Sequence, residues 1–276
     1  MTRSPVAPLE AGWTIVDGLP VYHRWCEQAG PDAPAIVHVH GFGISGTYLE
    51  PTAARLAATH RTYVPDLPGM GRSVRPPTPH DLVGLARALA SYCRQVGVER
   101  ATFLGNSLGC PVICEVAAEF PDLVERVVLV SPAGGPNNRP LPKALGQMAL
   151  DGPREPLSMV PIAVRDYLRF GVIQGFRLFG AMTRFPTIER VQALAIPTLV
   201  IAGRRDPLVD VQRVNVLAPL PDVAVVVIPG AHALNYSSPE RVAALVEAHR
   251  LGEPLHRADG PLRDVEVLLS SASAAR

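Results

Sequence analysis

This chain has almost no lysine and no excess of charge of either sign. Of its 276 residues, 26 are Lys or Arg, and only Lys143 is a lysine. Together with 29 prolines, this composition is typical of a GC-rich genome and indicates no function. The 25 acidic residues nearly balance the basic ones, and the net charge is +1. The sequence also contains no run of like charges that would form a basic face. We therefore expect no nucleic acid partner.

Long apolar runs are also missing. Stretches such as 124–133 and 196–203 have ten residues or fewer, whereas a membrane-spanning helix needs about 20. Residues 1–12 contain prolines and acidic side chains and have no apolar segment of the secretory type. We expect a cytoplasmic protein with no membrane partner, which acts on a small-molecule substrate as a monomer or a homodimer.

Cysteine is rare, and its spacing carries no ligand pattern. The four cysteines form no CxxC or CxxH set, so we expect neither a metal site nor a disulfide framework. We expect all four thiols to be reduced and mostly buried: Cys26, Cys93, Cys110 and Cys114.

Apolar strands alternate with amphipathic helices over most of the chain, and this order predicts an α/β fold with a mostly parallel sheet. The expected strands span residues 13–16, 21–26, 35–39, 62–64, 101–105, 124–130, 198–202 and 224–228. The expected helices span residues 46–59, 80–96, 108–119, 209–218 and 239–250.

The strand rhythm stops after residue 134 and resumes near residue 195. We assign residues 1–134 and 195–250 to the α/β core, and residues 135–194 to a small helical cap inserted into it. Residues 251–276 form a C-terminal tail whose small and polar residues are typical of a mobile segment, although 265–269 could dock as a short element.

A serine turn directly follows the strand at 101–104. The sequence Gly105-Asn106-Ser107-Leu108-Gly109 matches the G-x-S-x-G pattern, and the next helix begins at once. A nucleophile on a strained strand-to-helix turn needs small neighbours two positions to either side, so that the chain can reverse and expose the hydroxyl. Ser107 is therefore the candidate nucleophile.

A serine nucleophile needs a base, and the base needs an orienting carboxylate. Asp206 follows the strand at 198–202, and His232 follows the strand at 224–228. The carboxyl ends of strands in an open α/β sheet meet at one crevice, so both side chains are expected beside Ser107. Asp210 is a competing acid, whereas His249 and His256 lie in or after the last helix.

The loop His40-Gly41-Phe42-Gly43 follows the strand at 35–39 and matches the glycine-rich loops that stabilise an oxyanion. We assign the backbone N–H groups of Phe42 and Leu108 as the two oxyanion donors. His40 is expected to shape this loop and not to transfer protons. The turn-rich segment 66–73 is expected to be structural.

These pieces resemble the α/β-hydrolase superfamily over about residues 13–250. The matching motifs are the 40–43 loop, the 66–73 loop, the Gly105–Gly109 turn, Gly203–Asp206 and Gly230–His232. The resemblance implies an eight-stranded, mostly parallel sheet flanked by helices. It also implies that His232 deprotonates Ser107, that Ser107 attacks a carbonyl, and that water then releases the acyl group without any cofactor. A serine at position 107 argues against dehalogenase or epoxide hydrolase chemistry, in which an aspartate attacks.

The predicted cap offers less guidance on the substrate. Its apolar side chains suggest a hydrophobic pocket, and an uncharged carboxylic ester of small to medium size is the leading expectation. The residues concerned are Met148, Met159, Tyr167, Phe170, Phe176, Phe179 and Met182.

Two alternatives stay open. Asn106 and the small cap resemble the meta-cleavage product hydrolases, which cleave carbon–carbon bonds in diketo acids and bind the substrate carboxylate through a cap arginine. Candidates for that arginine are Arg154, Arg165, Arg169 and Arg177, although Ile44–Thr47 and Ala233-Leu234 depart from that family's pattern. The second alternative is a small-molecule receptor built on a hydrolase fold. A proline iminopeptidase or a lactonase is also conceivable, but no acidic cluster that would bind an amino terminus is evident in the cap.

Overall fold

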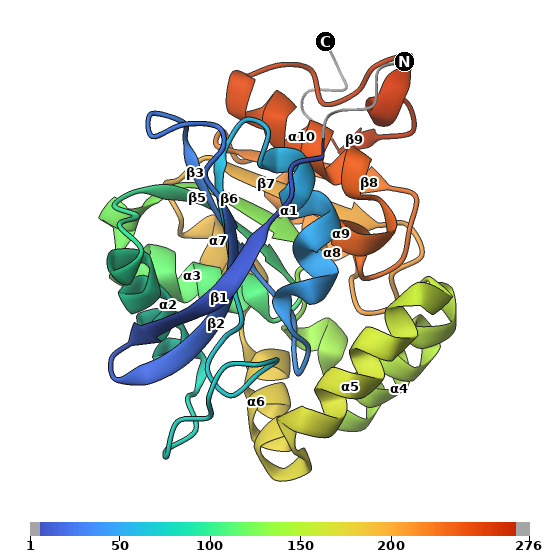
Figure 1. Cartoon of the computed structure of the whole chain (residues 1–276). Coiled ribbons are helices and arrows are strands. Elements are labelled where there is room, and N and C mark those ends of the chain that lie inside the picture. The colour runs from blue at the N-terminus through green and yellow to red at the C-terminus, as the bar shows by residue number, and fades with distance from the viewer. Residues whose placement is uncertain (1–5, 269–276) are drawn as a thin grey trace.

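The computed structural model describes residues 6–268, except for the side chains of residues 172–174. Its centre is a nine-stranded sheet with the order β1-β2-β4-β3-β5-β6-β7-β8-β9 (Figure 1). The strands are β1 (Glu10–Val16), β2 (Leu19–Cys26), β3 (Ala35–Val39), β4 (Arg61–Pro65), β5 (Ala101–Asn106), β6 (Val124–Val130), β7 (Thr198–Gly203), β8 (Val223–Ile228) and β9 (Glu266–Leu268).

The strands from β4 to β8 in this order are parallel, and the outer pairs β1–β2, β2–β4 and β8–β9 are antiparallel. The α/β fold is therefore confirmed, with one correction to the expected eight strands. The additional strand, β9, comes from the predicted tail and pairs with β8. Residues 269–276 of that tail lie outside the described residues.

Helices cover both faces of the sheet (Figure 1). Along β6, Val127 and Leu129 pack with α2 and α3, whereas Val128 and Val130 pack on the opposite face with α10. Such burial on both faces explains why the central strands are almost wholly apolar. The helices are α1 (Glu50–Leu56), α2 (Leu82–Gln95), α3 (Gly109–Glu119), α4 (Leu141–Asp151), α5 (Val160–Phe170), α6 (Val172–Arg184), α7 (Thr187–Gln192), α8 (Val211–Val214), α9 (Leu234–Ser237) and α10 (Pro239–Leu251).

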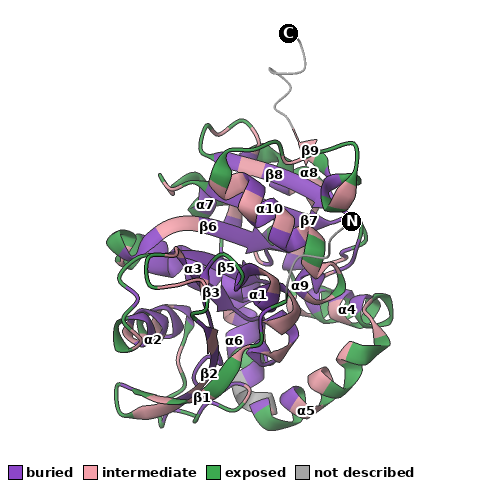
Figure 2. Cartoon of the chain, turned by 45° about the horizontal axis from the view of Figure 1, so that its top comes forward, coloured by how far each residue is buried: buried purple, intermediate pink, exposed green. Residues whose placement is uncertain are grey.

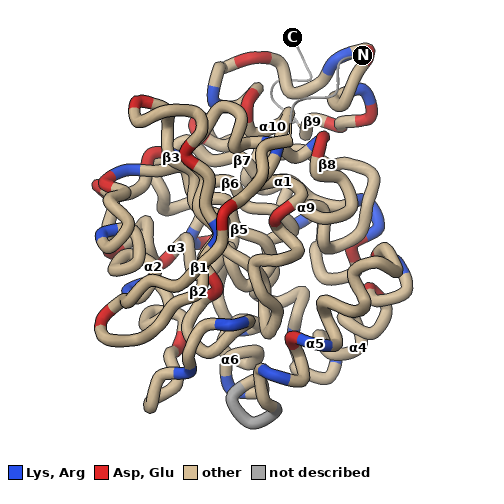
Figure 3. The backbone as a smooth tube through the Cα atoms, in the orientation of Figure 1, with Lys and Arg blue, Asp and Glu red and all other residues tan. Residues whose placement is uncertain are grey.

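Residues 135–194, called the insertion below, contain α4 to α7 between β6 and β7. Figure 1 shows α4, α5 and α6 grouped at one end of the molecule, and much of α5 is exposed in Figure 2. No helix within residues 6–268 has both the length and the apolar character needed to cross a bilayer. Basic and acidic residues are interspersed along the chain (Figure 3).

A buried ion pair joins β2 to the loop that follows β4. The Asp66 carboxylate, fully buried after β4, accepts hydrogen bonds from Arg24 Nη1 on β2 at 2.8 Å and from the Gly46 N–H at 2.8 Å. Its other oxygen accepts from the Arg72 N–H at 2.9 Å. Asp66 thus fixes the loop at 66–73 through Arg72 and the segment after the 40–43 loop through Gly46. Its role is structural.

We expect Asp66→Ala to lower the free energy of unfolding by about 3 to 5 kcal/mol, because it removes the fully buried carboxylate that pairs with Arg24 and accepts from the Gly46 and Arg72 N–H groups. The Arg24 guanidinium then keeps its ion pair with the partly exposed Glu50 but loses its buried partner. Urea denaturation followed by circular dichroism measures this change. Glu240→Ala is the control, since Glu240 pairs with Arg55 at the surface and its loss should cost less than about 1 kcal/mol. Equal effects of the two substitutions would contradict the structural role of Asp66.

Candidate active site

Ser107 occupies a tight turn between β5 and α3. Its φ of 55° lies in the left-handed region, which is strained for a residue with a side chain. A Cβ added to Gly109 would lie 2.2 Å from the carbonyl oxygen of Val39, and one added to Gly105 would lie 2.7 Å from the backbone of Gly109. Both glycines are therefore required by close packing, which brings the turn against the end of β3.

The 40–43 loop lies directly beside this turn. A Cβ on Gly41 would be 3.4 Å from Ser107 Cβ, and the Gly41 N–H donates to Tyr48 Oη at 2.8 Å. Among the described residues, neither the N–H of Phe42 nor that of Leu108 has a hydrogen-bond partner. These two free N–H groups belong to the residues that the sequence predicts as oxyanion donors.

His232 and Asp206 are joined by a short hydrogen bond. Nδ1 of His232 lies 2.8 Å from Oδ2 of Asp206, whose other oxygen accepts from the Leu208 N–H at 2.8 Å. Burial disfavours the charged imidazolium, but the charge and hydrogen bond of Asp206, with smaller contributions from Asp151 and Glu155, raise the pKa of His232 to about 9. Burial alone would raise the pKa of Asp206, yet the neighbouring His232 charge keeps it below its usual value.

The competing candidates lie elsewhere. Asp210 accepts from the Gln212 N–H at 3.0 Å at the start of α8 and does not contact His232. His256 bonds to the Val265 carbonyl oxygen, and His249 lies within α10. His40 accepts from the Leu67 N–H through Nε2 at 2.8 Å, which leaves Nδ1 to donate to the Gly41 carbonyl oxygen at 2.9 Å. Both ring nitrogens of His40 are therefore occupied in shaping the loop.

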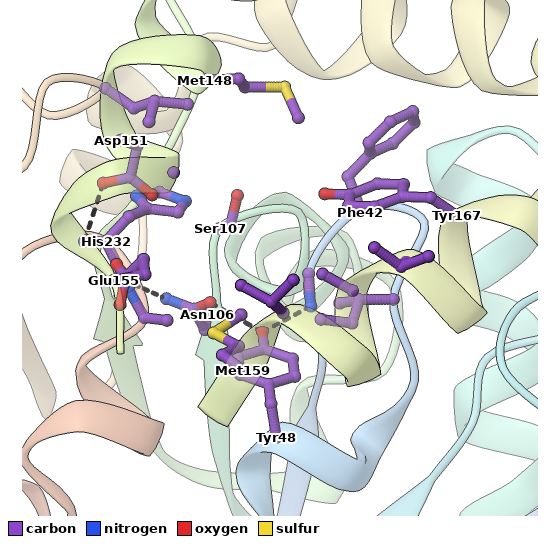
Figure 4. A pocket seen from close by; sticks show the side chains of 18 of the residues that line it. Phe42, Tyr48, Asn106, Ser107, Met148, Asp151, Glu155, Met159, Tyr167 and His232 are labelled. Carbon is purple, nitrogen blue, oxygen red and sulfur yellow. Dashed lines mark hydrogen bonds between the residues drawn. The ribbon is translucent and has the colours of Figure 1, made fainter. Parts of the chain in front are cut away.

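Ser107 and His232 line one cavity of about 250 Å³, closed on the other side by the insertion (Figure 4). Figure 4 shows His232, Asp151 and Glu155 to one side of Ser107 and Phe42 and Tyr167 to the other. Five of the seven apolar side chains suggested for the pocket line it, namely Met148, Met159, Tyr167, Phe179 and Met182. Of the other two, Phe170 packs edge-on against Phe42, and Phe176 is exposed.

No arginine or lysine is among the described residues that line this cavity. Arg165 forms an ion pair with Asp166 at 2.7 Å, and Arg154 donates to the Arg205 carbonyl oxygen. Arg169 and Arg177 are exposed. Within residues 6–268, no group of three or more His, Cys, Asp or Glu side chains has an arrangement that could hold a metal ion.

Sequence reasoning missed two features of the site. Tyr48 Oη donates to Asn106 Oδ1 at 2.7 Å, and Asn106 Nδ2 donates to the His232 carbonyl oxygen at 3.0 Å. This chain of hydrogen bonds connects three segments that are far apart in the sequence: the 3-10 turn of Tyr48, the end of β5 and the loop of His232. The second feature is the pair Asp151 and Glu155 in the insertion. Because α4 ends at Asp151 and Glu155 follows the short turn at 152–154, no helical periodicity in the sequence relates the two side chains.

Comparison with known proteins gives relatives of the chain and structures of the same fold. The chain is 36% identical over 130 residues to an uncharacterised protein of Mycobacterium tuberculosis; the match covers 47% of this chain and 37% of that protein, so it spans little more than a third of the relative. It is 29% identical to a putative carbamate hydrolase of Pseudomonas savastanoi, over 79% of this chain and 92% of the relative. The crystal structure of the enol-lactonase from Burkholderia xenovorans has the same fold, with a TM-score of 0.72, 22% identity, and coverage of 87% of this chain and 100% of that one. A model of the alpha/beta hydrolase family matches residues 36–245, most of the chain, which therefore belongs to this family.

Proposed function

We propose that this protein is a serine hydrolase that cleaves carboxylic esters of small to medium, largely apolar substrates. Ser107 is the nucleophile, His232 the general base and Asp206 the carboxylate that orients it. The N–H groups of Phe42 and Leu108 hold the oxyanion of the tetrahedral intermediate. Ser107 Oγ forms the acyl-enzyme, and a water molecule activated by His232 then releases the acid.

The observation that carries this proposal is the hydrogen-bonded pair of His232 and Asp206 beside Ser107. Asp206 bonds to Nδ1 of His232, so the imidazole proton on that nitrogen is fixed and Nε2 is left to accept a proton. Within the described residues the Ser107 hydroxyl makes no side-chain hydrogen bond, a common state of a catalytic serine before substrate binds. The two unpaired backbone donors supply the remaining part of the mechanism.

The cavity supports a compact and mostly uncharged substrate. Its volume of about 250 Å³ is just below the usual range for ligand pockets, about 300 to 1,000 Å³. In this proposal the insertion acts as the cap and limits the size of the substrate. Carbamates and lactones, named for two of the similar proteins, are acyl compounds that the same chemistry would attack.

The carbon–carbon hydrolase alternative has less support. It needs an arginine to bind the substrate carboxylate, and the four candidate arginines are turned to other partners or to solvent. The charged side chains in the cavity other than His232 are the acids Asp151 and Glu155, which would repel a carboxylate. We therefore favour ester hydrolysis.

Ser107→Ala should reduce kcat/KM for p-nitrophenyl butanoate by roughly 10³-fold or more, because it removes the nucleophile. Asp206→Asn should reduce it by about 10²- to 10⁴-fold, since the asparagine stabilises the wrong imidazole tautomer. Asp210→Asn is the matched control, and its activity should stay within about twofold of wild type. Retained turnover in Ser107→Ala would rule out the mechanism, and a larger loss in Asp210→Asn than in Asp206→Asn would reverse the choice of acid.

The rate should fall on acidification with an apparent pKa above the 6.5 of free histidine. The base must be neutral, and the raised pKa of His232, about 9, means that it becomes protonated at a higher pH than usual. Asp206→Asn removes the negative charge that raises the pKa of His232, while the imidazole stays buried. The pH midpoint of the residual activity should therefore move to lower pH. A pH-stat measurement of kcat/KM from pH 6 to 10 tests both statements, and an unchanged midpoint in the variant would contradict the assignment.

We expect p-nitrophenyl esters to be hydrolysed with an optimum at short acyl chains, because the cavity is small. The measurement compares acetate to laurate esters with a meta-cleavage dienoate, for wild type and Ser107→Ala. Consumption of the dienoate alone would favour the carbon–carbon hydrolase. Binding of these compounds without turnover, and unchanged in Ser107→Ala, would favour the receptor.

A further inference from the structure

Two carboxylates of the insertion enter an otherwise apolar cavity. Asp151, at the end of α4, is more than nine-tenths buried, and Glu155 follows four residues later. Both line the cavity that holds Ser107, and Figure 4 shows them on the side of His232. Burying such charges is costly unless they are paired, so their presence needs an explanation.

Among the described residues, one oxygen of each carboxylate has a hydrogen-bond partner. Glu155 Oε1 accepts from the Ala233 N–H at 2.7 Å, and Asp151 Oδ1 accepts from the His232 N–H at 3.3 Å. These bonds hold both side chains in place beside the histidine. Within the part of the chain that the structure describes, Glu155 Oε2 is buried and has no hydrogen-bond partner. The described residues that line the cavity include no Arg or Lys to neutralise the pair.

The position of the pair indicates which part of a substrate it faces. In ester hydrolysis the protonated His232 must give its proton to the oxygen of the leaving alcohol. The alcohol part of the ester therefore lies on the His232 side of Ser107, and the oxyanion lies on the side of Phe42. Asp151 and Glu155 are on the side of the alcohol (Figure 4).

We propose that Asp151 and Glu155 make this site selective for esters whose alcohol part carries a positively charged nitrogen, and that they exclude esters that carry a carboxylate there. The inference rests on the proposed ester hydrolysis and names its substrate class. A protonated or quaternary amine would supply the missing partner for the two carboxylates, while the methionine side chains around them contact its carbon atoms.

Electrostatics of the free site support this reading. His232 faces three acids, Asp206 after β7 and the pair Asp151 and Glu155 from the insertion. Burial, together with the neighbouring Glu155 and Asp206 charges and against the effect of His232, raises the pKa of Asp151 to about 6, so Asp151 is mostly ionised at neutral pH. A bound cation would offset this excess of negative charge and lower the pKa of His232 toward neutrality, which favours the neutral base.

The test measures protection of Ser107 from a fluorophosphonate, which forms a Ser107 Oγ–P bond and releases fluoride. Three alcohols of similar shape serve as protectants: choline, its neutral isostere 3,3-dimethylbutanol, and 4-hydroxybutanoate. We expect choline to protect wild type at a concentration about tenfold or more below that of the neutral alcohol, the size of effect that one charged hydrogen bond or ion pair gives. The carboxylate should protect least.

Asp151→Asn and Glu155→Gln, singly and together, keep an oxygen that can accept from the His232 and Ala233 N–H groups but remove the charges. In the double variant the preference for choline should disappear, while labelling of Ser107 persists. Glu189→Gln removes a carboxylate of α7 that does not line the cavity, and it should leave the preference unchanged.

The outcomes separate this inference from the proposed function. Failure of the fluorophosphonate to label Ser107 in wild type would overturn both. Labelling with equal protection by choline and 3,3-dimethylbutanol, or a preference that survives in the double variant, would overturn the selectivity alone. Protection by prolinamide and not by choline would also overturn it, because the cation would then lie in the acyl part. The same preference should appear as a ratio of kcat/KM for the acetates of choline and 3,3-dimethylbutanol.

Discussion

The close packing of Gly109 against the end of β3 is the contact on which the geometry of the site depends. A side chain at Gly109 would meet the Val39 carbonyl oxygen at 2.2 Å, so only glycine lets the Ser107 turn approach β3 this closely. The left-handed conformation of Ser107 is sustained by this contact and by the neighbouring parallel strands. Because β3 also leads into the 40–43 loop, the same contact brings the two unpaired N–H groups beside the serine. The serine and the proposed oxyanion donors are thus positioned by one piece of backbone packing.

The insertion is hydrogen-bonded to three of the loops around the site. Asp166 accepts from the Ser45 N–H next to the 40–43 loop, Gln147 donates to the Pro207 carbonyl oxygen beside Asp206, and Glu155 accepts from the Ala233 N–H beside His232. The wall of the cavity that the insertion forms is therefore held at two points to the loops of Asp206 and His232 and at a third point beside the 40–43 loop. A displacement of the insertion would have to break these bonds, so substrate selection and the positions of the reactive groups depend on each other.

The sheet and the convergence of three candidate residues could be predicted because local sequence patterns indicate them. Ser107, Asp206 and His232 each follow an apolar strand and a glycine, and parallel strands bring their carboxyl ends together. The sequence left Asp210 open as a competitor, since both aspartates follow β7, and only the fold turns Asp206 toward His232. The strand β9 is too short for a periodic signal. Asp151 and Glu155 could not be assigned either, because a helical insertion lacks the sheet that relates one segment to another, and its inward face is decided by long-range contacts.

Asp151 and Glu155, which give the cavity its negative charge, also raise the pKa of His232. Their effect on His232 as a base is therefore twofold. An imidazole whose pKa is raised to about 9 is a strong proton acceptor, but it is mostly protonated at pH 7. Removing the charges of Asp151 and Glu155 would increase the neutral fraction but weaken the base. Under the proposed selectivity, a cation on the substrate resolves this conflict, because it cancels part of the negative charge only while the substrate is bound. Binding of such a substrate would shift His232 toward the neutral form, which in the proposed mechanism activates Ser107.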